Sequence, residues 1–228
     1  MMLEVERKFL PSAAHLIARN AASPAFRNFK TLPTYTFTDI YYDQADKLRS
    51  AGIWVRKRDQ KWEAKIKLGG DYIHSQFCEI DTPGKIATML KQHIPMTSNM
   101  IDLTDLSTPT ELQPFGLTTF ASFTTTRQTW TASVDDKTDV SIVIDTTDFG
   151  HQVGEVELQV PFAEEDVSTT ATTATTQSEA IQSMQATLDA FMADHRMAFP
   201  QAECKGKLSA YFNWKRNARQ SGGDATDA

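Results

Sequence analysis

Charged and apolar side chains alternate along most of residues 3–10, with Arg7 as an exception, and this pattern constrains the fold more than any other stretch of the sequence. Because successive side chains of a strand point to opposite faces, Glu4, Glu6 and Lys8 share one face of the predicted strand. Two carboxylates and an ammonium group in one row suit a divalent cation next to an anionic ligand. A strand that exposes its charged face to water has the same pattern, so this segment alone leaves both interpretations open.

Later segments repeat the alternation with charges of both signs. Residues 53–58 and the segment after an Asp59-Gln60 turn form a predicted hairpin, and residues 152–162 form a further strand. The charged or aromatic residues that share one face of these strands are Trp54, Arg56, Arg58, Lys65, Glu155 and Glu157. Acidic and basic side chains therefore alternate between strands and do not separate into blocks.

Two architectures accommodate these strands. In a barrel of about eight strands, the charged faces line the lumen and the apolar faces pack outward under helices. In a sandwich, the charged faces meet solvent, and the periodicity does not distinguish the two. A charged lumen must hold water, ions or a charged guest, and a triphosphate with Mg²⁺ supplies both signs. Alternation places Arg127 on the same face as Phe123, so the barrel assignment requires a bulge between them.

Composition limits the classes of protein that fit. A chain of 228 residues, 40% of them apolar, can bury a sizeable core. The net charge of −6 argues against a general binder of nucleic acid or membrane surfaces. The two cysteines match no zinc spacing, and the sequence shows neither a signal peptide nor an apolar stretch of membrane-spanning length. We expect a cytoplasmic monomer without a nucleic-acid or membrane partner.

Helices and loops are predicted around the strands. The predicted helices span residues 13–21, with Ser12 as N-cap, and residues 83–93, 179–195 and 204–216. Residues 96–115 are predicted to form loops with one short helix, and the Ser/Thr/Ala-rich residues 168–176 are predicted to form a loop. We expect one domain over residues 1–216 and a disordered tail over residues 217–228.

The charged motifs resemble those of a known family. The sequence Glu4-Val5-Glu6-Arg7-Lys8-Phe9 resembles the Glu-x-Glu-x-Lys signature of the CYTH superfamily, the triphosphate tunnel metalloenzymes. The resemblance covers most of the chain and continues through residues 41–43, 54–58, 62–65, 127–130, 145–150, 153–157 and 207–208. Within the superfamily, the order of these stretches is most similar to that of thiamine triphosphatases.

This resemblance implies an α+β fold, a closed eight-stranded antiparallel β-barrel with helices packed outside. It also implies Mg²⁺-dependent hydrolysis of thiamine triphosphate to thiamine diphosphate and phosphate. The alternatives are hydrolysis of inorganic tripolyphosphate or nucleoside triphosphates, or cyclisation of ATP, in the same tunnel. A non-catalytic module that binds polyphosphate is a further alternative from another class of protein.

The resemblance further implies roles for particular residues. The implied metal ligands are Glu4, Glu6, Asp145 and Glu157. The implied substrate-binding residues are Lys8, Trp54, Arg56, Arg58, Lys65, Arg127, Glu155 and Lys207, of which Lys65 and Glu155 are also implied in catalysis. Trp54 would stack on the organic base. The chain departs from the animal members at Val143, where they carry a second Asp.

Overall fold

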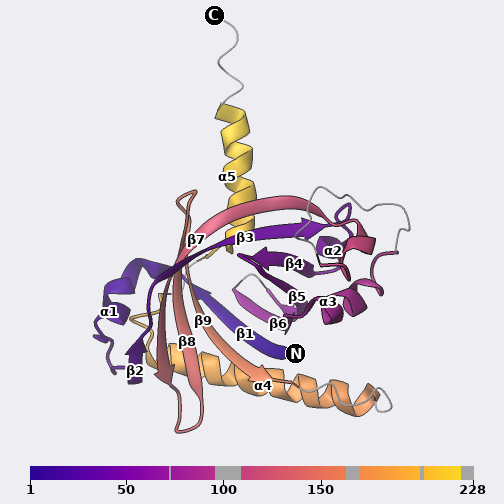
Figure 1. Ribbon diagram of the computed structural model, residues 1–228. Coiled ribbons are helices and arrows are strands. Elements are labelled where there is room, and N and C mark those ends of the chain that lie inside the picture. Colours follow the sequence, from indigo (N-terminus) through magenta and orange to yellow (C-terminus); the bar gives the residue numbers. More distant parts are fainter. Residues whose placement is uncertain (72, 96–108, 163–169, 201–202, 222–228) are drawn as a thin grey trace, which may run out of the picture.

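A computed structural model describes residues 1–71, 73–95, 109–162, 170–200 and 203–221 (Figure 1). Among the predicted segments, most of residues 96–115, residues 168 and 169, and the end of the tail from residue 222 lie outside the described residues. Within the described part of the chain, no helix has the length and hydropathy needed to cross a membrane.

Eight antiparallel strands close into a barrel. Around the barrel the order is β3-β4-β5-β6-β1-β9-β8-β7, and β7 pairs with both β8 and β3, which closes the circle. A ninth strand, β2, extends the sheet by pairing with the end of β7. The strands are β1 (Met2–Phe9), β2 (Arg27–Thr31), β3 (Tyr35–Asp43), β4 (Ile53–Arg58), β5 (Lys61–Gly70), β6 (His74–Ile80), β7 (Thr118–Ser133), β8 (Asp139–Thr147) and β9 (Gln152–Pro161). The predicted eight-stranded barrel is confirmed.

Helices pack on parts of the outer surface of the barrel against apolar side chains of the strands, and the last helix projects away from the barrel (Figure 1). The helices are α1 (Ala14–Ala18), α2 (Lys47–Ser50), α3 (Pro83–Leu90), α4 (Thr170–Asp194) and α5 (Lys207–Ser221), with 3-10 turns η1 (Pro11–Ala13) and η2 (Gln113–Phe115). Helix α4 lies against β1 and β9, and its Leu188 joins the buried cluster that contains Val5 and Val156. Helix α3 covers β5, and its Ile86 packs with Val55 and Ala64.

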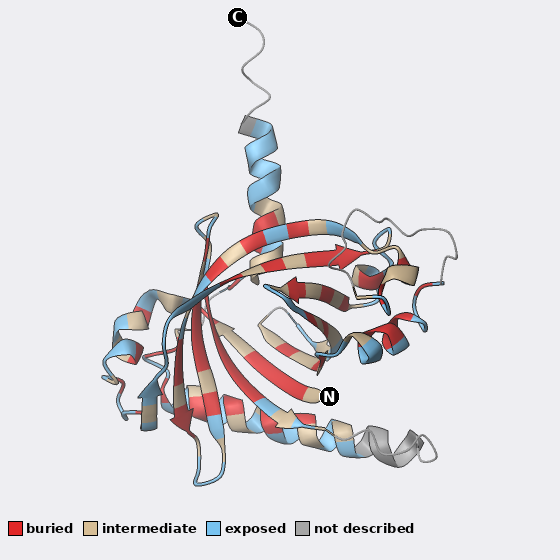
Figure 2. Cartoon of the chain, in the orientation of Figure 1, coloured by how far each residue is buried: buried red, intermediate tan, exposed pale blue. Residues whose placement is uncertain are grey.

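Burial alternates along β4, whereas β1, β8 and β9 are buried on both faces over most of their length (Figure 2). In β4, the odd-numbered residues from Ile53 are buried outside the barrel, and the even-numbered residues face the lumen. Burying the outward apolar faces under helices contributes roughly 25 cal/mol for each Å² removed from water. The sandwich with solvent-exposed charges is therefore excluded.

Several predicted helix boundaries are wrong. Ser12 is not an N-cap, since Pro11–Ala13 forms a 3-10 turn and α1 ends at Ala18. The predicted loop over residues 168–176 is helical from Thr170, because α4 extends through this Ser/Thr/Ala-rich sequence. The predicted tail begins too early, since α5 continues from residue 217 to Ser221. Low helix propensity in these segments is overridden by continuity with the packed parts of α4 and α5.

The predicted bulge between Phe123 and Arg127 is absent from the described strand. The register of β7 with β3 and β8 is regular from Phe123 through Arg127, so both side chains face the interior. Phe123 is buried there because Tyr211 of α5 closes this end of the barrel, with ring centroids 5.5 Å apart. The expectation was wrong because it assumed that apolar residues all point outward.

Gly154 in β9 allows Phe9 to lie flat against the sheet. A Cβ atom at residue 154 would lie 2.3 to 2.6 Å from three carbons of the Phe9 ring. Real Cβ atoms do not approach carbon so closely, so only glycine fits without a shift of the ring. The glycine of the 153–157 motif therefore serves packing and leaves the neighbouring Glu155 on the inner face.

Candidate active site

Three carboxylates converge inside the barrel from two neighbouring strands. Glu4 and Glu6 lie on β1, and the antiparallel register places Glu157 of β9 directly opposite Glu6. One ligand oxygen from each of these residues lies within 4.8 Å of the other two. We call Glu4, Glu6 and Glu157 the acidic triad. All three are at least nine-tenths buried, so their charges are poorly screened by water.

The pKa of Glu157 is raised by burial and by the nearby carboxylates. Burial raises the pKa of Glu157 to about 8, Arg127 opposes this rise, and the nearby carboxylates of Glu4 and Glu155 add to it. Crowded carboxylates of this kind bind a hard divalent cation, because the cation relieves both the repulsion and the loss of hydration. The donor set of the acidic triad therefore fits Mg²⁺.

Two lysines contact the acidic triad and place positive charge beside it. Lys8 donates a hydrogen bond to Glu6 and lies 3.7 Å from Glu155, to which it is also opposite in the strand register. Lys65 of β5 donates a hydrogen bond to Glu4. These contacts form because alternation in each strand sends the long side chains to the same lumen.

Two arginines of β4 are each held by a carboxylate on a neighbouring strand. Arg58 donates two hydrogen bonds of 2.8 Å to Asp39 of β3, one to each oxygen. Arg56 donates a hydrogen bond of 2.8 Å to Glu63 of β5 through Nε. In both pairs the two residues are direct register partners, which fixes the approach of the fork-shaped guanidinium group.

A third cationic group surrounds Asp145 of β8. Arg127 of β7 donates hydrogen bonds of 2.7 Å to both Asp145 oxygens, and Lys207 of α5 donates another. Lys207 also lies 3.4 Å from Glu155. Burial would raise the pKa of Asp145, but Lys207 and Arg127 outweigh it and hold the pKa below its ordinary value. Asp145 is therefore an anion that holds two cations in place.

A cavity of about 420 Å³ opens from these charges toward α5 and the loop between β5 and β6. Its lining includes the cationic side chains of Lys8, Arg56, Lys65 and Lys207. The same cavity is lined by the aromatic residues Tyr41, Trp54 and Phe77. Trp54 contacts Phe77 edge to face, with ring centroids 5.9 Å apart. The cavity therefore offers both cationic groups and aromatic surfaces, which suits a phosphate ester of an organic group.

The sequence and the fold of this chain match known proteins. A family model described as the CYTH domain matches residues 2–190. The thiamine-triphosphatase of Homo sapiens is 30% identical over 169 residues, which are 70% of this chain and 69% of that protein. The chain belongs to the CYTH domain family. Another relative, the thiamine-triphosphatase of Macaca fascicularis, is 29% identical over 70% of this chain and 69% of its own length.

A solved structure from Pyrococcus horikoshii shares the fold with this CYTH domain. It superimposes with a TM-score of 0.50 at 12% sequence identity, over 93% of this chain and 99% of that chain. At this identity the likeness supports the barrel architecture alone.

The lumen of the CYTH barrel contains the predicted site residues, but these residues form separate groups within it. Among the described residues, the acidic triad includes three of the four predicted metal ligands, and Asp145 lies outside it. The predicted substrate-binding residues Arg58 and Arg127 do not line the cavity, and they are paired with Asp39 and Asp145. Val143 faces the interior opposite Glu155 and is buried.

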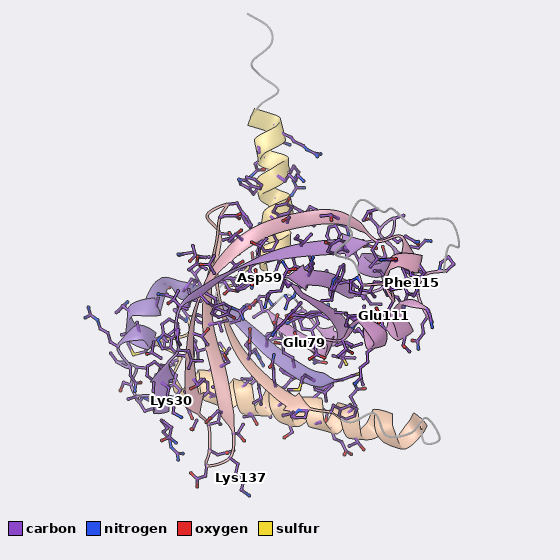
Figure 3. The ribbon with its side chains drawn as sticks, viewed as in Figure 1. Lys30, Asp59, Glu79, Glu111, Phe115 and Lys137 are labelled. Carbon is purple, nitrogen blue, oxygen red and sulfur yellow. The ribbon has the colours of Figure 1, made fainter. Side chains whose placement is uncertain are left out.

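Sequence reasoning assigned no role to four residues that contact the site. Asp39 and Glu63 hold the β4 arginines, Glu79 lies 2.9 Å from Lys65, and Phe37 packs under Arg58. Figure 3 shows Glu79 beside the barrel interior, whereas Lys137 lies at the remote tip of the β7–β8 hairpin. Strand parity contained the signal, since Phe37 and Asp39 share a face with Tyr41.

Proposed function

We propose that this protein hydrolyses thiamine triphosphate to thiamine diphosphate and phosphate, with Mg²⁺ as its metal. The observation that carries the proposal is the meeting of the acidic triad with a ring of lysines and arginines in one enclosed lumen. A triphosphate bound to a divalent cation needs groups of both signs at close range. The 30% identity to human thiamine-triphosphatase supports the same reaction.

The acidic triad is proposed to hold the metal ion. Three carboxylates within reach of one another provide the oxygen ligands that Mg²⁺ prefers, and the ion would keep several waters and phosphate oxygens in its shell. Asp145 is proposed to serve a different purpose, since Arg127 and Lys207 bind its oxygens. When bound, Mg²⁺ would neutralise phosphate charge and lower the pKa of a coordinated water.

The cations of the lumen are proposed to bind the triphosphate. Lys8, Arg56, Arg58, Lys65, Arg127 and Lys207 each form an ion pair with a carboxylate of the protein. Their ammonium and guanidinium groups are therefore already oriented inward, and an entering phosphate would share or replace the carboxylate partners. Removing one such group should cost about 2 to 4 kcal/mol of transition-state stabilisation.

Lys65 and Glu155 are proposed to act closest to the reacting phosphoryl group. Lys65 lines the cavity and contacts Glu4 and Glu6 of the acidic triad, where it would stabilise charge that develops on the transferred group. Burial would raise the pKa of Glu155, but Lys207, Lys8 and Arg127 outweigh it, and the pKa lies well below its ordinary value. Glu155 therefore stays ionised and would orient the attacking water by accepting a hydrogen bond. No covalent nucleophile is required.

Trp54 is proposed to hold the organic end of the substrate. Its indole lines the cavity together with Phe77 and Tyr41. A cationic thiazolium or an aminopyrimidine stacks favourably on such a surface, and a bare tripolyphosphate gains nothing from it. This aromatic surface favours a small organic triphosphate over an inorganic one as substrate, and the reaction involves neither nucleic acid nor a membrane.

The experiment that tests the proposal measures phosphate release from three substrates. We expect kcat/KM to be highest for thiamine triphosphate, lower for inorganic tripolyphosphate and ATP, and abolished by a chelator of divalent cations. Preference for tripolyphosphate would indicate an inorganic tripolyphosphatase. Binding of all three compounds without phosphate release would indicate a non-catalytic module, and either result would refute the proposal.

A further inference from the structure

Phe37 and Asp39 of β3 lie inside the barrel behind Arg58. Both are buried, with Asp39 0% and Phe37 2% exposed. They face inward because they alternate with Thr36 and Thr38, whose hydroxyls contact Thr126 and Thr124 on the outer side of β7. A buried carboxylate next to an anion-binding site calls for an explanation, since its charge opposes the binding of phosphate.

Asp39 holds the guanidinium of Arg58 in one plane. Nε and Nη2 of Arg58 each donate a hydrogen bond of 2.8 Å, and each bond goes to a different oxygen of Asp39. This fork-to-fork geometry fixes direction as well as distance. Nε of Arg56 lies 3.9 Å from the same carboxylate, so Asp39 faces both arginines of β4.

Phe37 fixes the same guanidinium from a perpendicular direction. The central carbon of the Arg58 guanidinium lies 4.0 Å from the centroid of the Phe37 ring, within the range of a cation–π contact. The corresponding carbon of Arg127 lies 5.6 Å from the same centroid. One aromatic ring thus lies beneath two of the cations of the lumen.

We propose that Asp39, together with Phe37, is a positioning residue that fixes the orientation of Arg58 toward the transferred phosphoryl group. Two NH groups of Arg58 point to Asp39, which leaves the remaining edge of the guanidinium for the ligand. The inference rests on the proposed function, because it takes Arg58 to contact a phosphate.

The charge of Asp39 allows an effect on phosphate affinity to be distinguished from an effect on the orientation of Arg58. Burial would raise the pKa of Asp39, but the hydrogen bonds from Arg58 and the charge of Arg56 outweigh it and lower the pKa, so the group is an anion. Removing this anion should leave tripolyphosphate affinity unchanged or stronger, because a competing negative charge disappears. If Asp39 orients Arg58, the same change should slow catalysis, because a misplaced catalytic group costs on the order of 100-fold.

The test compares Asp39→Asn with a control on the same strand, Thr38→Val. Asn keeps the shape of Asp39 and one acceptor oxygen, but it cannot receive two hydrogen bonds on two oxygens. We expect kcat for thiamine triphosphate to fall on the order of 100-fold, with the Kd for tripolyphosphate in chelator unchanged or lower. Thr38→Val, whose side chain points outward, should change neither. A kcat within about threefold of wild type, or a parallel loss of kcat and affinity in a folded variant, overturns the inference.

A second comparison tests whether Asp39 acts through Arg58. In an Arg58→Ala background, Asp39→Asn should lower kcat by less than about threefold, since the guanidinium that Asp39 orients is gone and Arg56 keeps Glu63 as its partner. An additional loss as large as in the wild-type background overturns the inference. If Asp39→Asn does not fold, Phe37→Leu provides the test, with an expected loss of about tenfold in kcat and little change in affinity.

The ¹⁵N NMR signal of the Arg58 Nε–H group separates this inference from the proposed function. In the wild type the Asp39 hydrogen bond should slow exchange of this proton with solvent, and Asp39→Asn should accelerate it. Failure of the wild-type protein to release phosphate refutes the proposed function, whatever the NMR result. Phosphate release by the wild type, with no change in exchange or kcat in Asp39→Asn, refutes the positioning role alone.

Discussion

Replacing Glu6 with Gln should change the affinities for metal and for phosphate in opposite directions. Glu6 belongs to the acidic triad and also accepts a hydrogen bond from Lys8. The substitution removes a charged ligand of the proposed Mg²⁺ site, and at the same time it releases an ammonium group. Mg²⁺ should bind more weakly, and metal-free tripolyphosphate should bind more tightly.

The structure sets the size of both effects. A hydrogen bond between charged groups contributes about 1.5 to 3 kcal/mol. Lys8 keeps Glu155 at 3.7 Å as a second partner, so the lower end of this range applies. This corresponds to a gain of about tenfold in metal-free tripolyphosphate affinity. Loss of a direct carboxylate ligand should weaken Mg²⁺ binding by at least about tenfold, since changes outside the coordination shell already cost that much.

Isothermal titration calorimetry measures the two affinities separately, with tripolyphosphate in chelator and with Mg²⁺ alone. The matched control is Glu63→Gln, which removes the carboxylate partner of Arg56 but leaves the acidic triad intact. This control should raise metal-free tripolyphosphate affinity without changing Mg²⁺ affinity. If Glu6→Gln leaves Mg²⁺ binding unchanged, or weakens metal-free tripolyphosphate binding, the reasoning about the lumen is wrong.

Three further predictions concern substrate choice, pH and packing. Trp54→Ala should raise KM for thiamine triphosphate about tenfold and leave tripolyphosphate kinetics nearly unchanged; equal losses on both substrates would argue against stacking. Because the pKa of Glu157 is raised to about 8, a proton must leave before metal binds, so Mg²⁺ affinity should rise about tenfold per pH unit below pH 8 and level off above it. Calorimetry across pH tests this, and Glu157→Gln should flatten the profile. Gly154→Ala should lower the free energy of unfolding by about 1 to 3 kcal/mol in urea titrations, because the new Cβ would overlap the Phe9 ring; an unchanged midpoint would contradict this.

The barrel was predictable because its strands carry a repeated two-residue period. In β1, β4 and β9 most charged residues fall on one parity, with Arg7 and Lys57 as exceptions, and the structure places that parity inside. Periodicity could not decide which face is inside, since both faces of a strand obey the same alternation. The burial of Val55 and Ala64 under Ile86 of α3 decides it, and that contact joins residues far apart in sequence.

The supporting residues of the site were harder to predict. Asp39 lies in a strand rich in aromatic residues, and its role is apparent only from its pairing with Arg58 of β4. Phe123 was misjudged because an apolar residue faces the lumen where Tyr211 of α5 closes the barrel. Both depend on cross-strand or helix–barrel pairing, which a single sequence encodes only indirectly.

The pairing of charges inside the lumen explains which ligands the barrel should accept. The lysines and arginines proposed to bind phosphate each form an ion pair with a protein carboxylate. A free anion must break such pairs and leave buried carboxylates without partners, which is costly. A free cation that binds the acidic triad must likewise displace Lys8 and Lys65 from Glu6 and Glu4. A triphosphate with its metal offers a new partner to both members of each broken pair. The lumen should therefore bind the complex more tightly than the separate affinities of its two components would suggest.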